Sequence, residues 1–175
     1  MKAKKKRILY NICLVVLIVI FIGSAGYLAS YFLQSRKSES QFDTLESMID
    51  EPVQADEIVY VATEGDAEPG LEFVSIDGTL VQKRFASIYQ KNHDFVGWLS
   101  IEDTQIDYPV MQTMEDEEYY IHRDFYGDYS AAGTLFADTE SNIEKPSDNI
   151  LIYGHNMKTG AMFGNLRNYE RLAYY

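Results

Sequence analysis

Residues 150–164 read ILIYGHNMKTGAMFG, an apolar run that ends at a glycine and a histidine and then changes its periodicity. The unbroken apolar run predicts a strand over Asn149–Tyr153 that is buried on both faces. A helix is expected next, because helical spacing appears at Met162, Phe163, Leu166 and Tyr169. His155 then stands on a loop at the end of a rigid strand. From that position alone, a histidine is more often structural than catalytic.

Strand-like runs also precede this stretch. They cover Val96–Ile101, Gln105–Gln112 and Gly133–Asp138. Pro109 suggests that the second run is an edge strand or contains a bulge, because proline donates no hydrogen bond to a neighbouring strand. The aromatic segment Tyr119–Phe125 fits either a short helix or a strand.

One helix is expected before these strands, from Thr79 to about Asn92, with an apolar face formed by Val81, Phe85, Ile88 and Tyr89. Strands with flanking helices favour a mainly β, α+β or barrel-like domain over a doubly wound sheet. We expect this domain, residues 79–175, to be incomplete. Few strand candidates remain to pair with both sides of Asn149–Tyr153.

The N-terminal region has the composition of a membrane anchor. Ile8–Leu33 is 26 residues long and carries no formal charge, which exceeds the roughly 20 residues that a helix needs to cross a bilayer. The basic tip 1–7 precedes it, so this tip is expected in the cytoplasm and the rest of the chain outside. A cleaved signal peptide is the alternative, because the densest apolar core, Ile12–Ile22, is short and is followed by Gly23-Ser24-Ala25.

Residues 34–78 are polar and acidic, and we interpret them as a stalk. Within them, helical spacing appears at Phe42, Leu45, Met48 and Ile49. Short strands are possible at Ile58–Ala62 and Leu71–Ile76, the second ended by the turn pair Asp77-Gly78.

Charge and residue usage exclude several classes of function. Residues 1–37 carry seven Lys or Arg and no acid, whereas residues 38–175 hold the other eight against 27 acids, so their net charges are +7 and −19. An acidic body repels phosphate backbones, and no nucleic acid partner is expected. Cys13 is the only cysteine and lies in the apolar segment, where it is no credible nucleophile.

Three further motifs are candidates for metal binding or catalysis, and none is supported by its residue spacing. His93, His122 and His155 lack the short spacings of metal ligands, so neither a metal nor a cofactor is expected. The sequence HRDF at 122–125 resembles a protein kinase catalytic loop, but Tyr129 stands where the metal-binding Asn is needed. We therefore interpret His122 as a surface residue. The acidic run at 115–118 is interpreted as a solvated cluster.

Five blocks in order resemble the N-terminal half of a class B sortase, over about Phe95 to Phe163. They are VGWLSI at 96–101, IDYPVMQ at 106–112, YYIHRDF at 119–125, GTLFAD at 133–138 and ILIYGHNMKTGAMFG at 150–164. The resemblance implies a closed eight-stranded β-barrel, anchored by one transmembrane helix in the cell membrane of a Gram-positive organism, with the enzyme outside. It also implies that His155 is the catalytic histidine.

The implied reaction is transpeptidation. Such an enzyme cleaves a protein's C-terminal sorting signal after threonine, holds the acyl group as a cysteine thioester, and transfers it to an amine of a peptidoglycan precursor or a pilin. The family cysteine and arginine have no counterpart here, since neither Arg167 nor Arg171 matches the family arginine. We therefore expect a truncated fragment that is inactive alone. The alternative is a non-catalytic, membrane-anchored protein that binds sorting-signal peptides or a partner.

Overall fold

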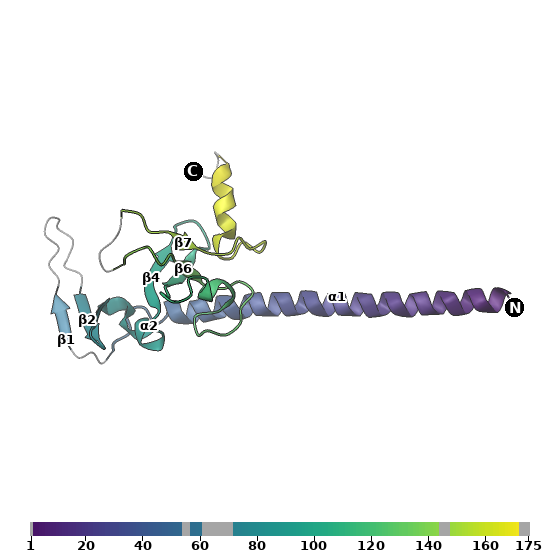
Figure 1. Ribbon diagram of the computed structural model, residues 1–175, viewed down its shortest axis with the longest axis horizontal. Coiled ribbons are helices and arrows are strands. Elements are labelled where there is room, and N and C mark those ends of the chain that lie inside the picture. The colour runs from purple at the N-terminus through teal and green to yellow at the C-terminus, as the bar shows by residue number, and fades with distance from the viewer. Residues whose placement is uncertain (1, 54–56, 61–71, 144–147, 172–175) are drawn as a thin grey trace. The chain divides into compact units, whose positions relative to one another are not determined.

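The computed structural model describes residues 2–53, 57–60, 72–143 and 148–171 (Figure 1). The chain divides into two compact units, residues 1–37 and residues 38–175. Helix α1, Lys2–Glu46, provides the whole described part of the first unit and the beginning of the second. Among the described residues, this is the one helix long and apolar enough to cross a membrane. Most of its large apolar side chains between Tyr10 and Leu33 are exposed.

The second unit begins with a three-stranded antiparallel sheet in the order β1-β2-β3. Its strands are β1 (Glu57–Tyr60), β2 (Glu72–Ile76) and β3 (Thr79–Gln82). Asp77 and Gly78 join the last two strands with φ angles of 49° and 82°, and two positive φ angles are what a type I′ hairpin turn requires. The predicted strands at 58–62 and 71–76 are confirmed in their described parts, whereas residues 61, 62 and 71 lie outside the described residues.

The helix expected from Thr79 begins later than predicted. Residues 79–82 form β3, and the helical part consists of η1 (Lys83–Phe85) and α2 (Ala86–Lys91). The hairpin explains the difference, because Val81 pairs with Val74 across it and both side chains are buried. The spacing of Val81 and Phe85 also fits one face of a helix, but the pairing of β3 with β2 determines the structure of residues 79–82. The predicted end of the helix is confirmed, since Asn92 is its C-cap.

A second sheet has four strands in the order β4-β5-β6-β7, with bounds Phe95–Ser100, Asp107–Met111, Leu135–Ala137 and Ile152–Tyr153. β5 runs antiparallel to β4 and parallel to β6, whereas β6 and β7 are antiparallel. Pro109 is paired with Trp98 of β4 and lies before the two residues of β5 that pair with β6. Proline has no backbone N–H to donate, and at Pro109 the β5 strand is paired with β4 but not with β6. The bulge lies in β4, between Phe95 and Gly97.

The closed eight-stranded barrel implied by the resemblance is not formed by the described residues. They form two open sheets, of three and four strands, in an α+β arrangement. The four-stranded sheet has β4 and β7 at its outer positions, and closure would require pairing at those edges.

The prediction for residues 149–153 was wrong in its burial. β7 has two residues and pairs only with β6 in the four-stranded sheet, while Ile150, Leu151 and Tyr153 are 44%, 53% and 42% exposed. The apolar run lies at an edge, where nothing among the described residues covers its outer side. The strands buried throughout or nearly so are β5 and β6 instead.

The main core lies around β5 and β6 and includes part of the expected stalk. Phe42 and Leu45, at the end of α1, are 3% and 0% exposed, and the Phe42 ring lies 5.0 Å from that of Tyr108 on β5. They pack with Ile88, Phe95, Ile106, Val110, Met111, Tyr120, Phe125, Ala132, Leu135, Phe136, Ala137 and Met162. The compact unit therefore begins at Ser38, so residues 38–46 are not a separate stalk.

A buried hydrogen-bond network connects α2 to the segment between β5 and β6. The Tyr120 hydroxyl donates to Asp94 Oδ2 at 2.7 Å and accepts from Asn92 Nδ2 at 2.7 Å. Asn92 Nδ2 also donates to the carbonyl of Phe125 at 2.7 Å. Each of these polar groups has a partner, so the network ties residues 119–125 to the end of α2 without leaving a buried group unpaired.

Alkaline pH should destabilise this unit through Tyr120. Burial, and then the hydrogen bond to the Asp94 carboxylate, raise the pKa of the Tyr120 phenol above its ordinary value of 10.0. Its contribution to stability is complete below that value and declines as the pH rises above it. Tyr120→Phe should lower the free energy of unfolding by about 1–2 kcal/mol at pH 7 and flatten the decline between about pH 10 and 11. Urea unfolding of the full chain in detergent micelles measures both effects.

The matched control is Tyr126→Phe, since Tyr126 is 50% exposed. It should keep the stability at pH 7 and the alkaline decline. If Tyr120→Phe and Tyr126→Phe have the same profile, the buried phenol is not the titrating group.

Candidate functional site

His155 lies on a closed loop just after β7. Its carbonyl accepts a hydrogen bond of 2.9 Å from the backbone N–H of Phe163, the first residue of η3 (Phe163–Glu170). Asn156 and Met162 form an antiparallel bridge inside the same loop. The two ends of the loop are therefore tied together, and the backbone that carries His155 is held at the edge of the sheet. The predicted helix after the loop is confirmed in position, with 3-10 form.

Gly154 lets this loop pack against the core. A methyl group at this position would overlap Leu135 Cδ2 of β6 and lie 3.2 Å from the Phe163 ring. The close neighbours of Gly154 are therefore side chains of β6 and η3. Any larger residue would push the His155 backbone away from β6.

The His155 imidazole has a buried nitrogen without a partner. Among the described residues, Nε2 is the one buried side-chain polar atom without a hydrogen-bond partner. Leaving such a group unpaired costs on the order of 1–3 kcal/mol, which makes this nitrogen a candidate for a functional role. A nitrogen kept free on a fixed backbone can exchange a proton with a group that arrives during a reaction.

His122 lies against His155. It is the last residue of η2 (Tyr119–His122), and the two imidazole centroids are 5.0 Å apart with planes inclined by 30°. His122 is exposed, as predicted, but it is not an isolated surface residue. Sequence reasoning missed this pair because 33 residues separate its members. One feature of the sequence could have drawn attention to His122: it lies inside YYIHRDF, one of the blocks that resemble a class B sortase.

The third histidine is elsewhere in the unit. His93 stacks on Tyr89 at 4.7 Å, and its Nε2 lies 3.7 Å from Asp77 Oδ2. No group of three or more His, Cys, Asp or Glu side chains in the described part of the chain is arranged to hold a metal ion.

A pocket of about 310 Å³ opens beside His155. It is lined by Glu117, Glu118, Ile121, Phe136, Tyr153, Gly154 and His155. Its apolar wall comes from η2 and β6, and its acidic side comes from the loop before η2. The Glu117 carboxylate is held in place, because it accepts hydrogen bonds from the Thr139 hydroxyl at 2.9 Å and backbone N–H at 3.3 Å. The pocket thus combines an apolar wall with a few fixed polar groups, as ligand sites in proteins often do.

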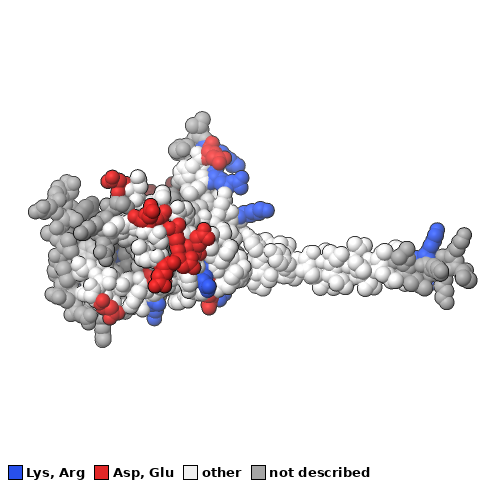
Figure 2. All heavy atoms as spheres, in the orientation of Figure 1, with Lys and Arg blue, Asp and Glu red and all other residues white. Residues whose placement is uncertain are grey.

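Acidic groups surround the pocket. The Tyr153 hydroxyl donates to Asp138 Oδ2 at 3.3 Å, and partial desolvation, together with this carboxylate, raises the pKa of the Tyr153 phenol. Figure 2 shows acidic side chains gathered in a group on one face of the compact unit. A negative potential of this kind favours cationic ligands over anionic ones.

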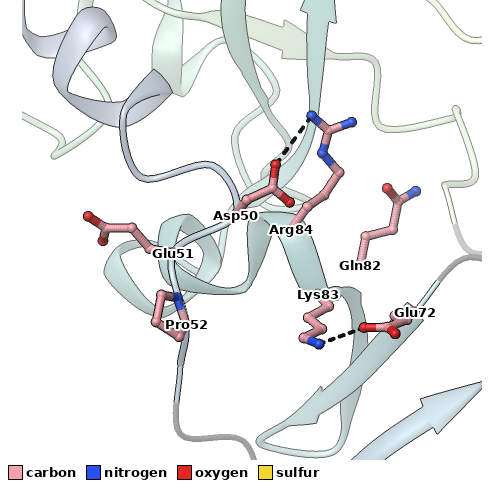
Figure 3. A pocket seen from close by; sticks show the side chains of 7 residues that line it. All are labelled: Asp50, Glu51, Pro52, Glu72, Gln82, Lys83 and Arg84. Atoms are coloured by element: carbon pink, nitrogen blue, oxygen red, sulfur yellow. Dashed lines mark hydrogen bonds and ion pairs between the residues drawn. The ribbon is translucent and has the colours of Figure 1, made fainter.

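A second hollow lies at the three-stranded sheet and has a volume of about 440 Å³ (Figure 3). Its two cations are matched by carboxylates: Lys83 Nζ lies 2.6 Å from Glu72 Oε2, and Arg84 Nη2 lies 4.0 Å from Asp50 Oδ2. Exposed pairs of this kind contribute little to stability. Because each cation already has a carboxylate beside it, the hollow is no strong candidate for binding an anion.

Comparison with known proteins finds relatives among the class B sortases. No protein-family model matches the chain. A sortase B of Listeria monocytogenes is 43% identical over 89 residues, which cover 51% of this chain and 36% of the relative. A sortase B of Staphylococcus aureus is 30% identical over 95 residues, covering 54% and 38%.

Solved structures agree. The sortase B of Bacillus anthracis in complex with AAEK1 aligns with a TM-score of 0.63 and 26% identity, over 82% of this chain and 58% of that one. The S. aureus sortase B complexed with MTSET aligns with a TM-score of 0.51 and 29% identity, over 53% and 39%. The chain is thus related to class B sortases and spans less than two-fifths of the length of the two curated relatives.

The packing at Gly154 can be tested by substitution. Gly154→Ala should lower the free energy of unfolding by about 1–3 kcal/mol, because the added methyl group meets Leu135 and Phe163. The control is Gly97→Ala in β4, where an added methyl group meets nothing within 4 Å. Urea unfolding of both variants measures the difference. Equal stabilities would show that Gly154 is not tightly packed.

Proposed function

We propose that this chain provides the histidine side of a class B sortase active site, with His155 as the acid–base residue. The observation that carries the proposal is the free, buried Nε2 of His155 on a tied loop, in a chain related to sortase B. The reaction is cleavage of a C-terminal sorting signal after threonine and transfer of the acyl group to a peptidoglycan precursor or pilin amine.

The chemistry suits an imidazole in this position. A cysteine thiol has an ordinary pKa near 8.5, and a neighbouring imidazolium favours the reactive thiolate. The thiolate attacks the threonine carbonyl, and the imidazolium gives its proton to the departing amine as the carbon–nitrogen bond breaks. The neutral imidazole then takes a proton from the incoming amine, which displaces the thiolate from the thioester. A guanidinium would stabilise the oxyanion in both steps.

The cysteine and arginine of this proposal are supplied by polypeptide other than residues 1–175. Cys13 lies in the apolar segment of α1, in the other compact unit. Arg167 belongs to η3 and Arg171 is its C-cap, directly after the histidine loop. The 175-residue chain by itself is therefore proposed to be inactive.

The alternative is a non-catalytic protein that binds sorting peptides at the membrane. The pocket beside His155 favours it, because the apolar walls at Ile121 and Phe136 are present in a chain without a second cysteine. Binding of a sorting peptide without turnover, in every context tested, would support this alternative.

Turnover assays separate the two functions. The full 175-residue chain in detergent should release no product from a fluorogenic sorting peptide, and clear turnover would refute the requirement for an external cysteine.

A chimera in which residues 95–171 replace the matching segment of the Listeria sortase B should cleave that enzyme's peptide. His155→Ala in this chimera should reduce the rate at least 100-fold, with His93→Ala as the control. A His155→Ala chimera that keeps its activity would refute the proposal.

The proposed location is the cell membrane, with residues 1–7 in the cytoplasm, 8–33 across the bilayer and the second unit outside. Its partners are then the membrane, secreted proteins that carry a sorting signal, and the acceptor amine. The charge difference supports this orientation, because positive residues flank the cytoplasmic end of an anchor.

Single-cysteine labelling tests the topology. In a Cys13→Ala background, Met114→Cys should react with an impermeant maleimide on intact cells, since Met114 is 71% exposed. Lys4→Cys should react only after permeabilisation. The unmodified chain, with Cys13 alone, should resist the reagent because its thiol faces hydrocarbon. The reverse labelling pattern would overturn the orientation.

A further inference from the structure

We propose that His122 is a positioning residue for His155: its stacked ring holds the His155 imidazole in one orientation. The proposal rests on the assignment of His155 as the acid–base residue. It adds a second imidazole to that assignment.

The backbone on the His122 side is held firmly. The His122 carbonyl accepts a hydrogen bond of 3.0 Å from Ser130, and the Tyr120 carbonyl accepts one of 3.1 Å from Thr134. Gly133, with φ of +64°, packs so closely on the Ile121 carbonyl that any side chain there would overlap it. The His122 ring therefore comes from a rigid segment, as His155 does from its tied loop.

The His155 ring needs a neighbour to limit its rotation. Its Nε2 makes no hydrogen bond among the described residues, so this end of the ring is not held by a polar partner. The His122 ring, 5.0 Å away and inclined by 30°, provides a flat surface against it. Offset aromatic contacts at such distances are favourable. A polar partner at Nε2 would hold the ring equally well but would block the nitrogen needed for proton transfer, whereas stacking leaves it free.

The neighbouring Arg123 is directed elsewhere. Its guanidinium lies 4.6 Å from the centre of the Tyr119 ring and donates to the Gly127 carbonyl at 3.0 Å. The ring of His122 is therefore the group that lies against the His155 imidazole.

NMR spectroscopy of the full 175-residue chain in detergent micelles tests the proposal. The three histidines are labelled with carbon-13, and the order of the His155 ring is measured. His122→Phe keeps an aromatic ring at this position and should leave the His155 ring ordered. His122→Ala removes the stacked ring and should average the His155 ring signals. His93→Gln is the control and should leave the His155 ring ordered, because His93 stacks on Tyr89.

An ordered His155 ring in the His122→Ala variant would overturn the proposal. If His122→Ala fails to fold, His122→Leu keeps an apolar side chain without a ring and replaces it in the comparison with His122→Phe. The measurement requires no cysteine and no turnover. An inactive chimera in which the order of the His155 ring depends on His122 would therefore refute the transpeptidase assignment and support the pair. An active chimera in which that order is independent of His122 would do the reverse.

Discussion

The parallel pairing of β5 with β6 is the contact on which the candidate site depends. It consists of two residue pairs, Val110 with Leu135 and Met111 with Phe136, all four buried. The connection between these strands contains η2, which ends at His122, and β6 in turn pairs with β7, which leads to His155. One short buried pairing therefore brings both histidines to the same edge of the sheet.

Side-chain hydrogen bonds reinforce that pairing at the end of β5. The Gln112 side chain donates to the carbonyls of Asp138 and Ser141 at 2.6 and 2.9 Å, and Ser141 Oγ accepts from the Leu151 N–H at 3.0 Å. These bonds connect β5 with both ends of the segment between β6 and β7. A contact between two buried strands is more resistant to local opening when its connecting loop is tied in this way.

Two polar side chains of this unit, Tyr120 and His155, differ in how they are hydrogen-bonded. The Tyr120 hydroxyl has both a donor and an acceptor partner, and this network serves to hold η2 in place. The His155 Nε2 has no such partner among the described residues. A fully paired polar group stabilises the fold, whereas a buried one without a partner is a candidate for chemistry. The relationship to class B sortases agrees with this difference.

The sequence by itself determined the approximate positions of the strands of the second sheet, the Asp77-Gly78 turn and the apolar N-terminal helix. Each depends on local periodicity, turn chemistry or residue blocks that lie close together in the chain. Only the tertiary structure decided that Thr79–Gln82 is a strand, that Phe42 and Leu45 enter the core, that 149–153 lies at an exposed edge, and that His122 stacks on His155. The reason is that an apolar run shows that a segment avoids water but not what covers it, and a contact between residues 33 positions apart depends on strand pairing that local pattern does not contain.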